Sequence, residues 1–328
     1  MQRNYLIVAV IAAGLLVFAF VTASSVGNFG ITLMSGLFQG MLLFLVASGL
    51  SIIFGLMDVL NLAQGSYFMV GAYVSYSFHH SPEMMTVIPN PDLRFLMAVL
   101  VAVGIGALLG GILERGLLRP LYARPIFQIV LTFGVSLVLL EAVKFIWSTT
   151  PYSWTELFAF REGFFELFGQ RFSTYRLFVI AMGFALIIAI ALLLQRTRIG
   201  IIIRAGVEDS EMVEALGVNV RAVFTLMFTL GCAVAAFGGA IAAPFLGAST
   251  SMANTFLLPA VAVVVLGGLG SYIGTAISSV LLGLAVAVVA NFVSSPAINQ
   301  PVWQSLTPMI LLILVLLVRP SGLFGKGS

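Results

Sequence analysis

Polar side chains that could do chemistry are scarce in this sequence, and most of them stand alone between apolar runs. One segment, residues 49–73, differs because it combines four closely spaced polar side chains with several glycines that can break a helix. Irregular backbone is tolerated at membrane depth where protein buries it or where it lines a water-filled cavity. The polar residues of this segment therefore either stabilise the packing of helices or offer hydrogen bonds to a polar solute. These four polar side chains are Asp58, Asn61, Gln64 and Ser66, and Tyr67 directly follows the last of them.

Ionisable side chains inside apolar runs are functional suspects, because an unpaired charge is costly in hydrocarbon. Glu141 and Lys144 are three residues apart, so they share one face of a helix and can neutralise each other. We expect an ion pair here rather than a proton relay, which usually presents an isolated carboxylate. His79 and His80 are adjacent, so their side chains should point apart, and we predict no metal site.

Motifs typical of enzymes are missing from the sequence. It has no G-x-x-x-x-G-K-[ST] segment for nucleoside triphosphates, and the nearest string, residues 322–328, has different spacing and no Ser or Thr directly after Lys326. Neither H-E-x-x-H nor G-x-S-x-G occurs. The lone Cys232 excludes an intrachain disulfide. We predict no catalytic, cofactor-binding or metal-binding residue in this chain.

Composition indicates which elements must position these side chains. Of 328 residues, 61% are hydrophobic and 8% are charged, against about 25% charged in a typical globular protein. No Asp, Glu, Lys or Arg occurs from residue 222 to residue 318, a stretch far too long for one buried helix. The net charge of +3 comes without a basic run among aromatic residues, so it indicates that the basic residues orient the chain in the membrane lipid rather than bind nucleic acid. The sequence predicts one all-α polytopic membrane domain, residues 1–328.

Apolar runs separated by charges or turn residues predict about ten transmembrane helices, some of them short or broken. The eighth run has 15 residues and is about 22 Å long as a helix, short of the roughly 30 Å hydrocarbon core. Four glycines within residues 265–274 permit a tight turn there, so the run either crosses fully or turns back. The predicted spans are 5–23, 30–56, 59–78, 95–113, 125–147, 177–194, 222–243, 256–270, 272–293 and 302–318.

Basic residues predict the orientation of the chain. Arg3 near one end and Arg319 near the other should both lie in the cytoplasm, which requires an even number of crossings and is met by ten. Ten of the fifteen basic residues then lie on the cytoplasmic side and four on the outer side. The outer, periplasmic loop 148–176 carries aromatic side chains among charges, which is typical of an amphipathic helix on the membrane surface. These are Trp154, Phe158, Phe160, Phe164, Phe165 and Phe168.

The large cytoplasmic loop, residues 195–221, is expected to hold a short helix. Asp209 or Ser210 can cap its start, and Gly217 can end it in the left-handed conformation. A helix of about seven residues does not persist alone in water, so it must pack on its own bundle or on a cytoplasmic partner. Its apolar face comprises Met212, Val213 and Leu216, and its carboxylates are Glu211 and Glu214.

Five segments of the chain resemble the permease subunits of ATP-binding-cassette importers for branched-chain amino acids, the LivH type. They occur in the family's order and span most of the chain. The resemblance implies a transport subunit of the bacterial inner membrane, which moves these amino acids, or related small amides or urea, from the periplasm into the cytoplasm. The segments are 49–73, 113–121, 214–221, 265–274 and 316–325.

That resemblance also implies partners: a second, homologous permease, two cytoplasmic ATPases and a periplasmic solute-binding protein. In such permeases the cytoplasmic loop holds a coupling helix that sits in a cleft of the ATPase, and this maps onto Asp209–Gly217. We further expect the polar side chains of residues 61–67 to border the translocation path of a transported zwitterion. The alternative is an ion-coupled secondary transporter of a small polar solute, which the scarcity of unpaired membrane carboxylates disfavours.

Overall fold

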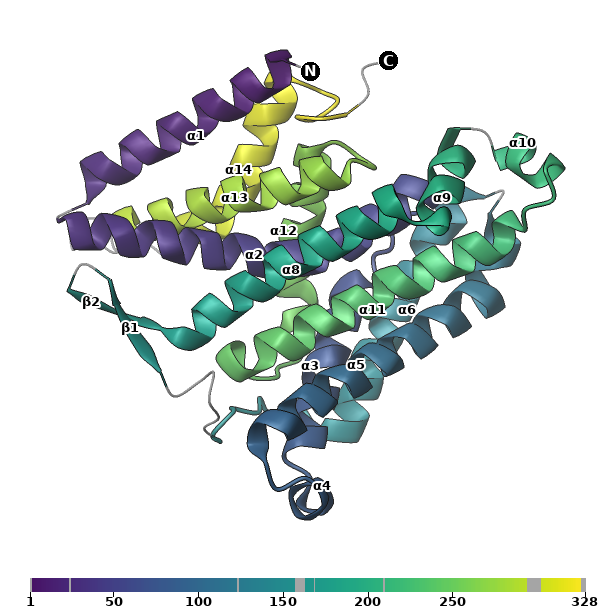
Figure 1. Cartoon of the computed structure of the whole chain (residues 1–328), viewed down its shortest axis with the longest axis horizontal. Helices are drawn as coiled ribbons and strands as arrows, with labels where there is room; N and C mark the ends of the chain where they lie inside the picture. Colours follow the sequence, from purple (N-terminus) through teal and green to yellow (C-terminus); the bar gives the residue numbers. More distant parts are fainter. Residues whose placement is uncertain are drawn as a thin grey trace.

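The computed structural model describes residues 2–23, 25–122, 124–156, 163–167, 169–208, 210–293 and 302–325. Most of these residues are helical, and the expected all-α fold of a polytopic membrane protein is confirmed. Figure 1 shows the helices packed side by side in one bundle, with α1 at one edge and α5 and α6 at the other. The helices are α1 (Gln2–Thr22), α2 (Val26–Met57), α3 (Gln64–His79), α4 (Pro82–Val87), α5 (Pro91–Leu113), α6 (Pro125–Trp147), α8 (Thr174–Arg196), α9 (Arg198–Glu208), α10 (Ser210–Ala215), α11 (Val220–Leu246), α12 (Met252–Gly267), α13 (Tyr272–Val293) and α14 (Val302–Val318).

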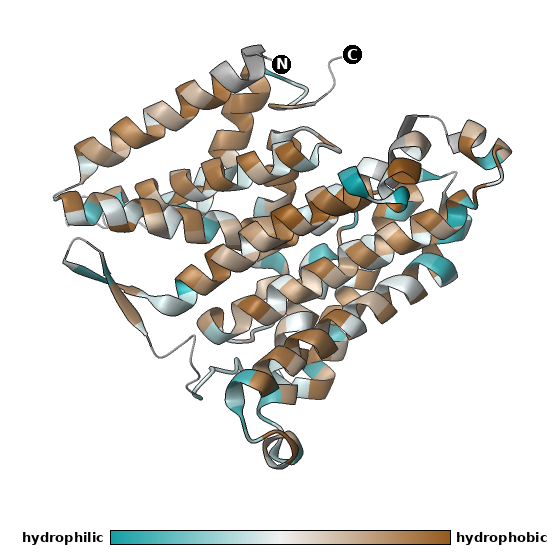
Figure 2. Ribbon diagram, in the orientation of Figure 1, coloured by the Kyte–Doolittle hydropathy of each residue, from teal (hydrophilic) through white to brown (hydrophobic). Residues whose placement is uncertain are grey.

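Several helices match the thickness of a membrane. Within the described ranges, six are long and apolar enough to cross one, and three shorter apolar helices accompany them. Each predicted span overlaps one helix, although α3 begins at Gln64 rather than at Val59, and α5 continues through a π-helical turn, Glu114–Leu118. Figure 2 shows hydrophobic residues along the helices and hydrophilic residues gathered toward their ends. This distribution is typical of a multi-pass membrane protein.

Helix α2 lies at the centre of the bundle and packs on α13, α11 and α12. All of its residues from 41 to 50 are buried. Where α2 meets α13 the backbones approach closely, because a Cβ atom on Gly283 would lie only 2.2 Å from the backbone nitrogen of Gly40. In lipid, apolar side chains gain little by contacting each other, so small residues that allow close packing hold helices together. The glycines at 40 and 283 therefore fix how these two helices meet.

The two ends of the bundle carry different elements. Helices α9 and α10 lie at one end, and the hairpin of β1 (Phe164–Leu167) and β2 (Gln170–Ser173) lies at the other (Figure 1). Ile7 of α1 and Val318 of α14 line one apolar pocket of about 580 Å³. The first turns of α1 therefore lie beside the last turn of α14, at the same end of the bundle.

In residues 163–167 and 169–173 the loop has no helix of the kind that its aromatic pattern predicts, and residues 157–162 of the predicted helix lie outside the described residues. Strands β1 and β2 form an antiparallel hairpin, in which Phe165 pairs with Phe172, and Gly169 before β2 has φ +76°. Strands favour aromatic side chains, and a glycine with positive φ supports a turn rather than a continuing helix. Trp154 is buried instead of lying on a surface. The remaining predicted aromatics of this loop, Phe158, Phe160 and Phe168, lie outside the described residues.

Candidate translocation and coupling sites

Polar side chains rather than proline build the break between α2 and α3. Helix α2 ends at Met57. The next residue, Asp58, caps it with a left-handed backbone, φ +52°, and its N–H donates to the carbonyl of Phe54 at 3.0 Å. Asn61 Oδ1 then accepts a hydrogen bond from the backbone N–H of Ala63 at 3.1 Å, a local turn that asparagine favours. Helix α3 starts at Gln64. Residues 58–63 thus leave helical geometry beside the bundle core.

This break brings together the four residues predicted to border a translocation path, and all four are buried. Asn61 Nδ2 donates to Oε1 of Gln64 at 3.1 Å, and Gln64 Nε2 donates to the carbonyl of Gly231, on α11, at 2.9 Å. The hydroxyl oxygens of Ser66 and Ser136, which belongs to α6, lie 2.9 Å apart. In this conformation the polar groups tie α3 to α11 and α6.

Close packing keeps these side chains away from solvent. Tyr67 belongs to a buried cluster that contains Phe228 and Cys232 of α11. A Cβ atom on Gly49 would lie 2.1 Å from Gln64 Nε2, so glycine there makes room for the amide. Buried polar groups are costly unless they are hydrogen-bonded, and here the partners are supplied by neighbouring helices. A solute that passes this point has to replace these hydrogen bonds.

A cavity of about 560 Å³ opens at the end of α2 that carries the break. It is lined by Phe54 of α2, by Asp58 directly after it, and by Gly270 and Ser271 of the α12–α13 turn. From the C-terminal segment it is lined by Pro320, Ser321, Phe324 and Gly325. Three of the segments that carry the family resemblance therefore meet at one cavity. Nothing in the sequence indicated this contact, because the end of α2 and the α12–α13 turn are more than a hundred residues apart in the chain.

Backbone hydrogen bonds hold the C-terminal segment against this cavity. The N–H groups of Leu323 and Phe324 donate to the carbonyls of Leu266 and Gly267, at 2.8 and 3.0 Å. The predicted glycine-rich break is the tight turn that connects α12 and α13, with φ +96° at Gly268. A side chain at Gly268 would also collide with the backbone of residue 325. The glycine thus allows both the turn and the docking of the C-terminal segment.

The predicted short cytoplasmic helix corresponds to α10, and its C-terminus has the expected geometry. Gly217 is left-handed with φ +85°, its N–H donates to the carbonyl of Glu214, and the N–H of Val218 donates to the carbonyl of Val213. Together these bonds form a Schellman motif, which satisfies carbonyl groups that the helix end leaves unpaired. Asp209, one of the two expected capping residues, lies outside the described residues.

Helix α10 does not bury its whole apolar face within the chain. Val213 is 6% exposed, whereas Met212 is 62% and Leu216 is 77% exposed. The helix packs on α9 and α11 and lies at the edge of the bundle (Figure 1). Glu214 is exposed beside this face, and nothing is described for the side chain of Glu211. The exposed side chains of Met212 and Leu216 can therefore contact another protein.

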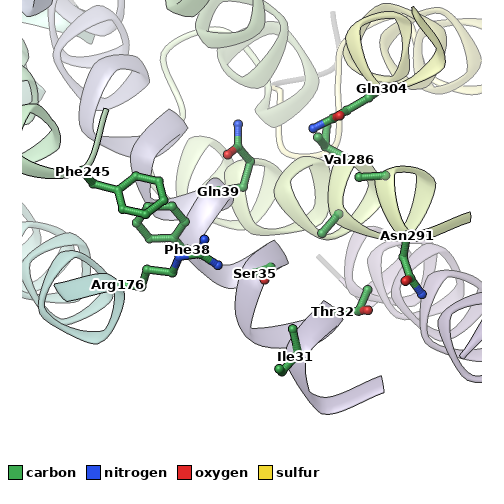
Figure 3. Close-up of a pocket in the computed structure, with 12 residues that line it drawn as sticks. Ile31, Thr32, Ser35, Phe38, Gln39, Arg176, Phe245, Val286, Asn291 and Gln304 are labelled. Carbon is green, nitrogen blue, oxygen red and sulfur yellow. The ribbon is translucent and has the colours of Figure 1, made fainter. Parts of the chain in front are cut away.

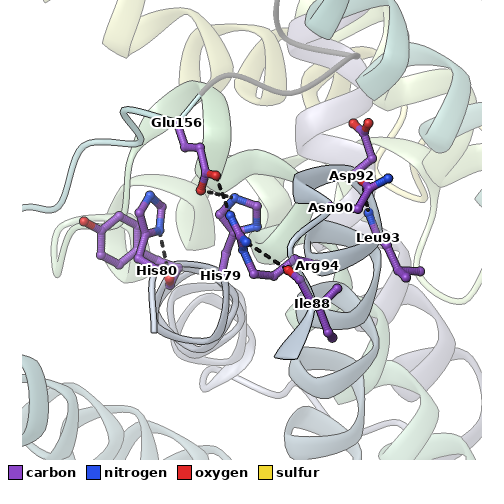
Figure 4. Close-up of polar contacts among 9 residues, drawn as sticks. His79, His80, Ile88, Asn90, Asp92, Leu93, Arg94 and Glu156 are labelled. Atoms are coloured by element: carbon purple, nitrogen blue, oxygen red, sulfur yellow. Dashed lines mark hydrogen bonds and ion pairs between the residues drawn. The ribbon is translucent and has the colours of Figure 1, made fainter. Parts of the chain in front are cut away.

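At the opposite end of the bundle, a charged cluster fastens the outer loop to two helices (Figure 4). Glu156 accepts a hydrogen bond from Arg94 Nη2, and its Oε2 lies 3.0 Å from Nε2 of the fully buried His79. Arg94 Nη1 also donates to the carbonyl of Ile88 at 3.0 Å. Partial burial raises the pKa of Glu156, but the hydrogen bond from Arg94 and the surrounding positive charge outweigh this effect, so the pKa lies below its ordinary value.

Sequence reasoning missed this cluster and predicted another ion pair correctly. The members at 79, 94 and 156 come from α3, α5 and the outer loop, so no periodic spacing relates them. Glu141 and Lys144 form the expected pair, with Lys144 Nζ 2.7 Å from Glu141 Oε1. Both lie near the end of α6, and the carboxylate side chain is 68% exposed. The pair is therefore not a buried proton site.

Comparison with known proteins indicates one family. The model of the family described as branched-chain amino acid transport system permease component matches residues 32–316. The high-affinity branched-chain amino acid transport system permease protein LivH of Escherichia coli (strain K12) is 28% identical over 86% of this chain and 91% of its own length. The corresponding permease protein BraD of Pseudomonas aeruginosa is 29% identical over 90% of this chain and 95% of its own. A probable LivH of Methanocaldococcus jannaschii is 27% identical over 87% of this chain and 89% of its own. No solved structure matches the chain significantly.

Proposed function

The chain belongs to the branched-chain amino acid transport system permease family, and from this premise we propose that it is the membrane-spanning subunit of an ATP-driven importer of branched-chain amino acids. The observation that carries the proposal is the extent of the family match, residues 32–316, which includes nine of the ten expected spans in whole or in part, and the short helix α10. Related amides or urea are the other candidate cargo.

ATP hydrolysis is assigned to separate subunits. The chain has no G-x-x-x-x-G-K-[ST] segment, so the energy of ATP has to reach it through a contact between proteins. Helix α10 supports such a contact, because Met212 and Leu216 leave an apolar patch exposed beside an exposed carboxylate at Glu214. Burial of this patch on an ATPase would stabilise the complex, and the carboxylate would help orient it. The remaining proposed partners are a second permease, identical or homologous, and a periplasmic binding protein.

The proposed orientation places α9, α10 and both termini in the cytoplasm, and the β1–β2 hairpin in the periplasm of the bacterial inner membrane. Three features support it. The first turns of α1 lie beside the end of α14, α10 lies at the end opposite the hairpin, and basic residues favour the α10 side. An even number of crossings, ten in this proposal, brings both termini to one side.

The translocation path is proposed to pass the break between α2 and α3. Asn61, Gln64, Ser66 and Tyr67 border it, and all four are buried in the present conformation, where Asn61 bonds Gln64, Gln64 bonds Gly231 of α11 and Ser66 bonds Ser136 of α6. Opening would exchange the bond that Gln64 Nε2 donates to Gly231 for one that it donates to the carboxylate of the solute. Such an exchange is favourable only if each buried polar group keeps a partner.

The function is tested by reconstitution into liposomes. The chain is co-expressed with ATPase and second permease subunits of the same kind of transport system, purified in mild detergent, and assayed for uptake of labelled leucine with loaded binding protein. Uptake should require ATP and should vanish when the P-loop lysine of the ATPase is replaced. Uptake by the isolated chain, driven by an ion gradient without ATP, would instead establish the secondary transporter.

A further inference from the structure

A second polar cavity, of about 330 Å³, is drawn in Figure 3. Its Arg176 follows strand β2 of the hairpin closely in sequence, and none of its lining residues belongs to the α2–α3 break. It is lined by residues of α2, the first turn of α8, the last turn of α11, and the facing parts of α13 and α14. Its volume lies at the lower end of the roughly 300 to 1,000 Å³ typical of small-molecule sites. The polar lining consists of Thr32, Ser35, Gln39, Arg176, Asn291 and Gln304.

Arg176 is held in this cavity by aromatic rings. Its guanidinium carbon lies 4.9 Å from the ring centroid of Phe245 and 5.5 Å from those of Phe38 and Phe172. Figure 3 shows the side chain alongside the rings of Phe38 and Phe245. Such contacts attract the cation and fix its position, although they do not neutralise its charge.

No anion accompanies this arginine among the described residues. None of their ion pairs involves Arg176, and its Nε is buried without a hydrogen-bond partner. The other cavity residues are neutral. A guanidinium in an apolar setting is costly unless an anion or several acceptors meet it. The cavity therefore has the charge of a site for a negatively charged group.

The side chains that line the cavity indicate which class of anionic ligand fits it. A guanidinium binds a carboxylate through two parallel hydrogen bonds, which its planar fork favours. Apolar walls from Phe38, Phe245 and Val286 suit an aliphatic side chain, and the amide oxygens of Asn291 and Gln304 can accept hydrogen bonds from an ammonium group. One small ligand has all three groups, an aliphatic α-amino acid.

We propose that this cavity is a substrate site on the permease itself, in which Arg176 binds the carboxylate of an aliphatic amino acid before it reaches the α2–α3 break. The proposal rests on the proposed function, because it takes the transported solute as the ligand. The permease would then select for the carboxylate and the aliphatic side chain a second time, after the binding protein has done so. Uncharged amides lack the group that Arg176 recognises.

The test measures protection of a single introduced thiol. Ser35→Cys places a thiol in the cavity, and the native Cys232 is fully buried, so an impermeant maleimide labels one position of this chain, which is read out on the separated subunit. The complete importer is labelled in phosphatidylcholine nanodiscs with and without leucine and without binding protein. Ser251→Cys, at an exposed position before α12, serves as the control, and Gln39→Cys replaces Ser35→Cys if that variant fails to assemble.

Leucine is expected to slow labelling about tenfold once it exceeds its dissociation constant tenfold, and to leave the control unchanged. Leucinamide, which has no carboxylate, should not protect at the same concentration. Arg176→Gln should abolish protection by leucine, while Arg176→Lys should retain part of it. Equal protection by leucine and leucinamide, or full protection in Arg176→Gln, would overturn the proposal.

Two further measurements distinguish failure of the cavity proposal from failure of the proposed function. Protection that follows added phosphatidylglycerol and not leucine would assign the cavity to a lipid phosphate and refute the amino-acid site. Leucine uptake by the unmodified complex with binding protein is measured in parallel. Normal uptake without any protection refutes only the cavity site, whereas absent uptake of leucine refutes the proposed function.

Discussion

Replacement of Leu216 in α10 by glutamate is expected to uncouple ATP hydrolysis from transport. Full burial of a leucine side chain contributes about 1.5 to 3 kcal/mol. Because Leu216 is 77% exposed, about three quarters of that, roughly 1 to 2 kcal/mol, remains available to a partner. Loss of this contribution weakens ATPase association about 5- to 30-fold, and a buried carboxylate adds a further desolvation cost.

Gly217 provides an independent perturbation of the same helix. A Cβ atom there would meet nothing within 4 Å, so any effect of Gly217→Val comes from its left-handed backbone with φ +85°. That conformation costs a residue with a side chain about 1 to 2 kcal/mol. The strain would loosen the Schellman motif and change how α10 presents Met212 to its partner, while the bundle stays folded.

The assay is ATP turnover of the reconstituted complex, with and without loaded binding protein, together with co-purification of the ATPase. Both variants should insert normally and lose ATPase association or stimulation by the binding protein. Leu216→Met, which keeps volume and apolar character, should behave like the unmodified protein. Normal stimulation and uptake in Leu216→Glu and in Gly217→Val would refute the coupling role and leave α10 a loop-packing element.

Three other predictions concern the path, the outer cluster and the topology. The double variant Asn61→Leu, Gln64→Leu should assemble normally and lower leucine uptake about tenfold or more, since the carbonyl that Gln64 meets loses its partner; unimpaired uptake would remove both residues from the path. Because the pKa of Glu156 is lowered in the folded protein, its carboxylate stabilises the fold fully above the ordinary pKa of 4.5, and this stability is lost as the pH falls through the folded-state pKa. In that acidic range the melting temperature should fall less steeply with pH in Glu156→Gln than in the unmodified protein. Equal dependence of melting temperature on pH in the two proteins would contradict this. An impermeant thiol reagent applied to intact cells should label a cysteine at Glu162 and not one at Ser328; the reverse pattern would invert the topology.

The class of the fold was predictable from sequence because lipid imposes a strong constraint. A chain without charges from residue 222 to residue 318 can satisfy its backbone in a membrane only as helices or a closed barrel, and its runs have helical lengths. Local signals were equally readable. Gly217 at a helix end and the i,i+3 spacing of Glu141 and Lys144 depend only on neighbours within one turn, and the structure has both as expected.

Contacts between distant segments were decided by the tertiary structure alone. The sequence places polar residues at 61–67, but only packing on α11 and α6 gives Gln64 the carbonyl of Gly231 and Ser66 the hydroxyl of Ser136. In the same way, the three rings around Arg176 come from α2, β2 and α11. Period and composition report which face of a helix is apolar. They do not report which helix that face meets, because this depends on the close approach of whole backbones at glycines and on the loops that connect them.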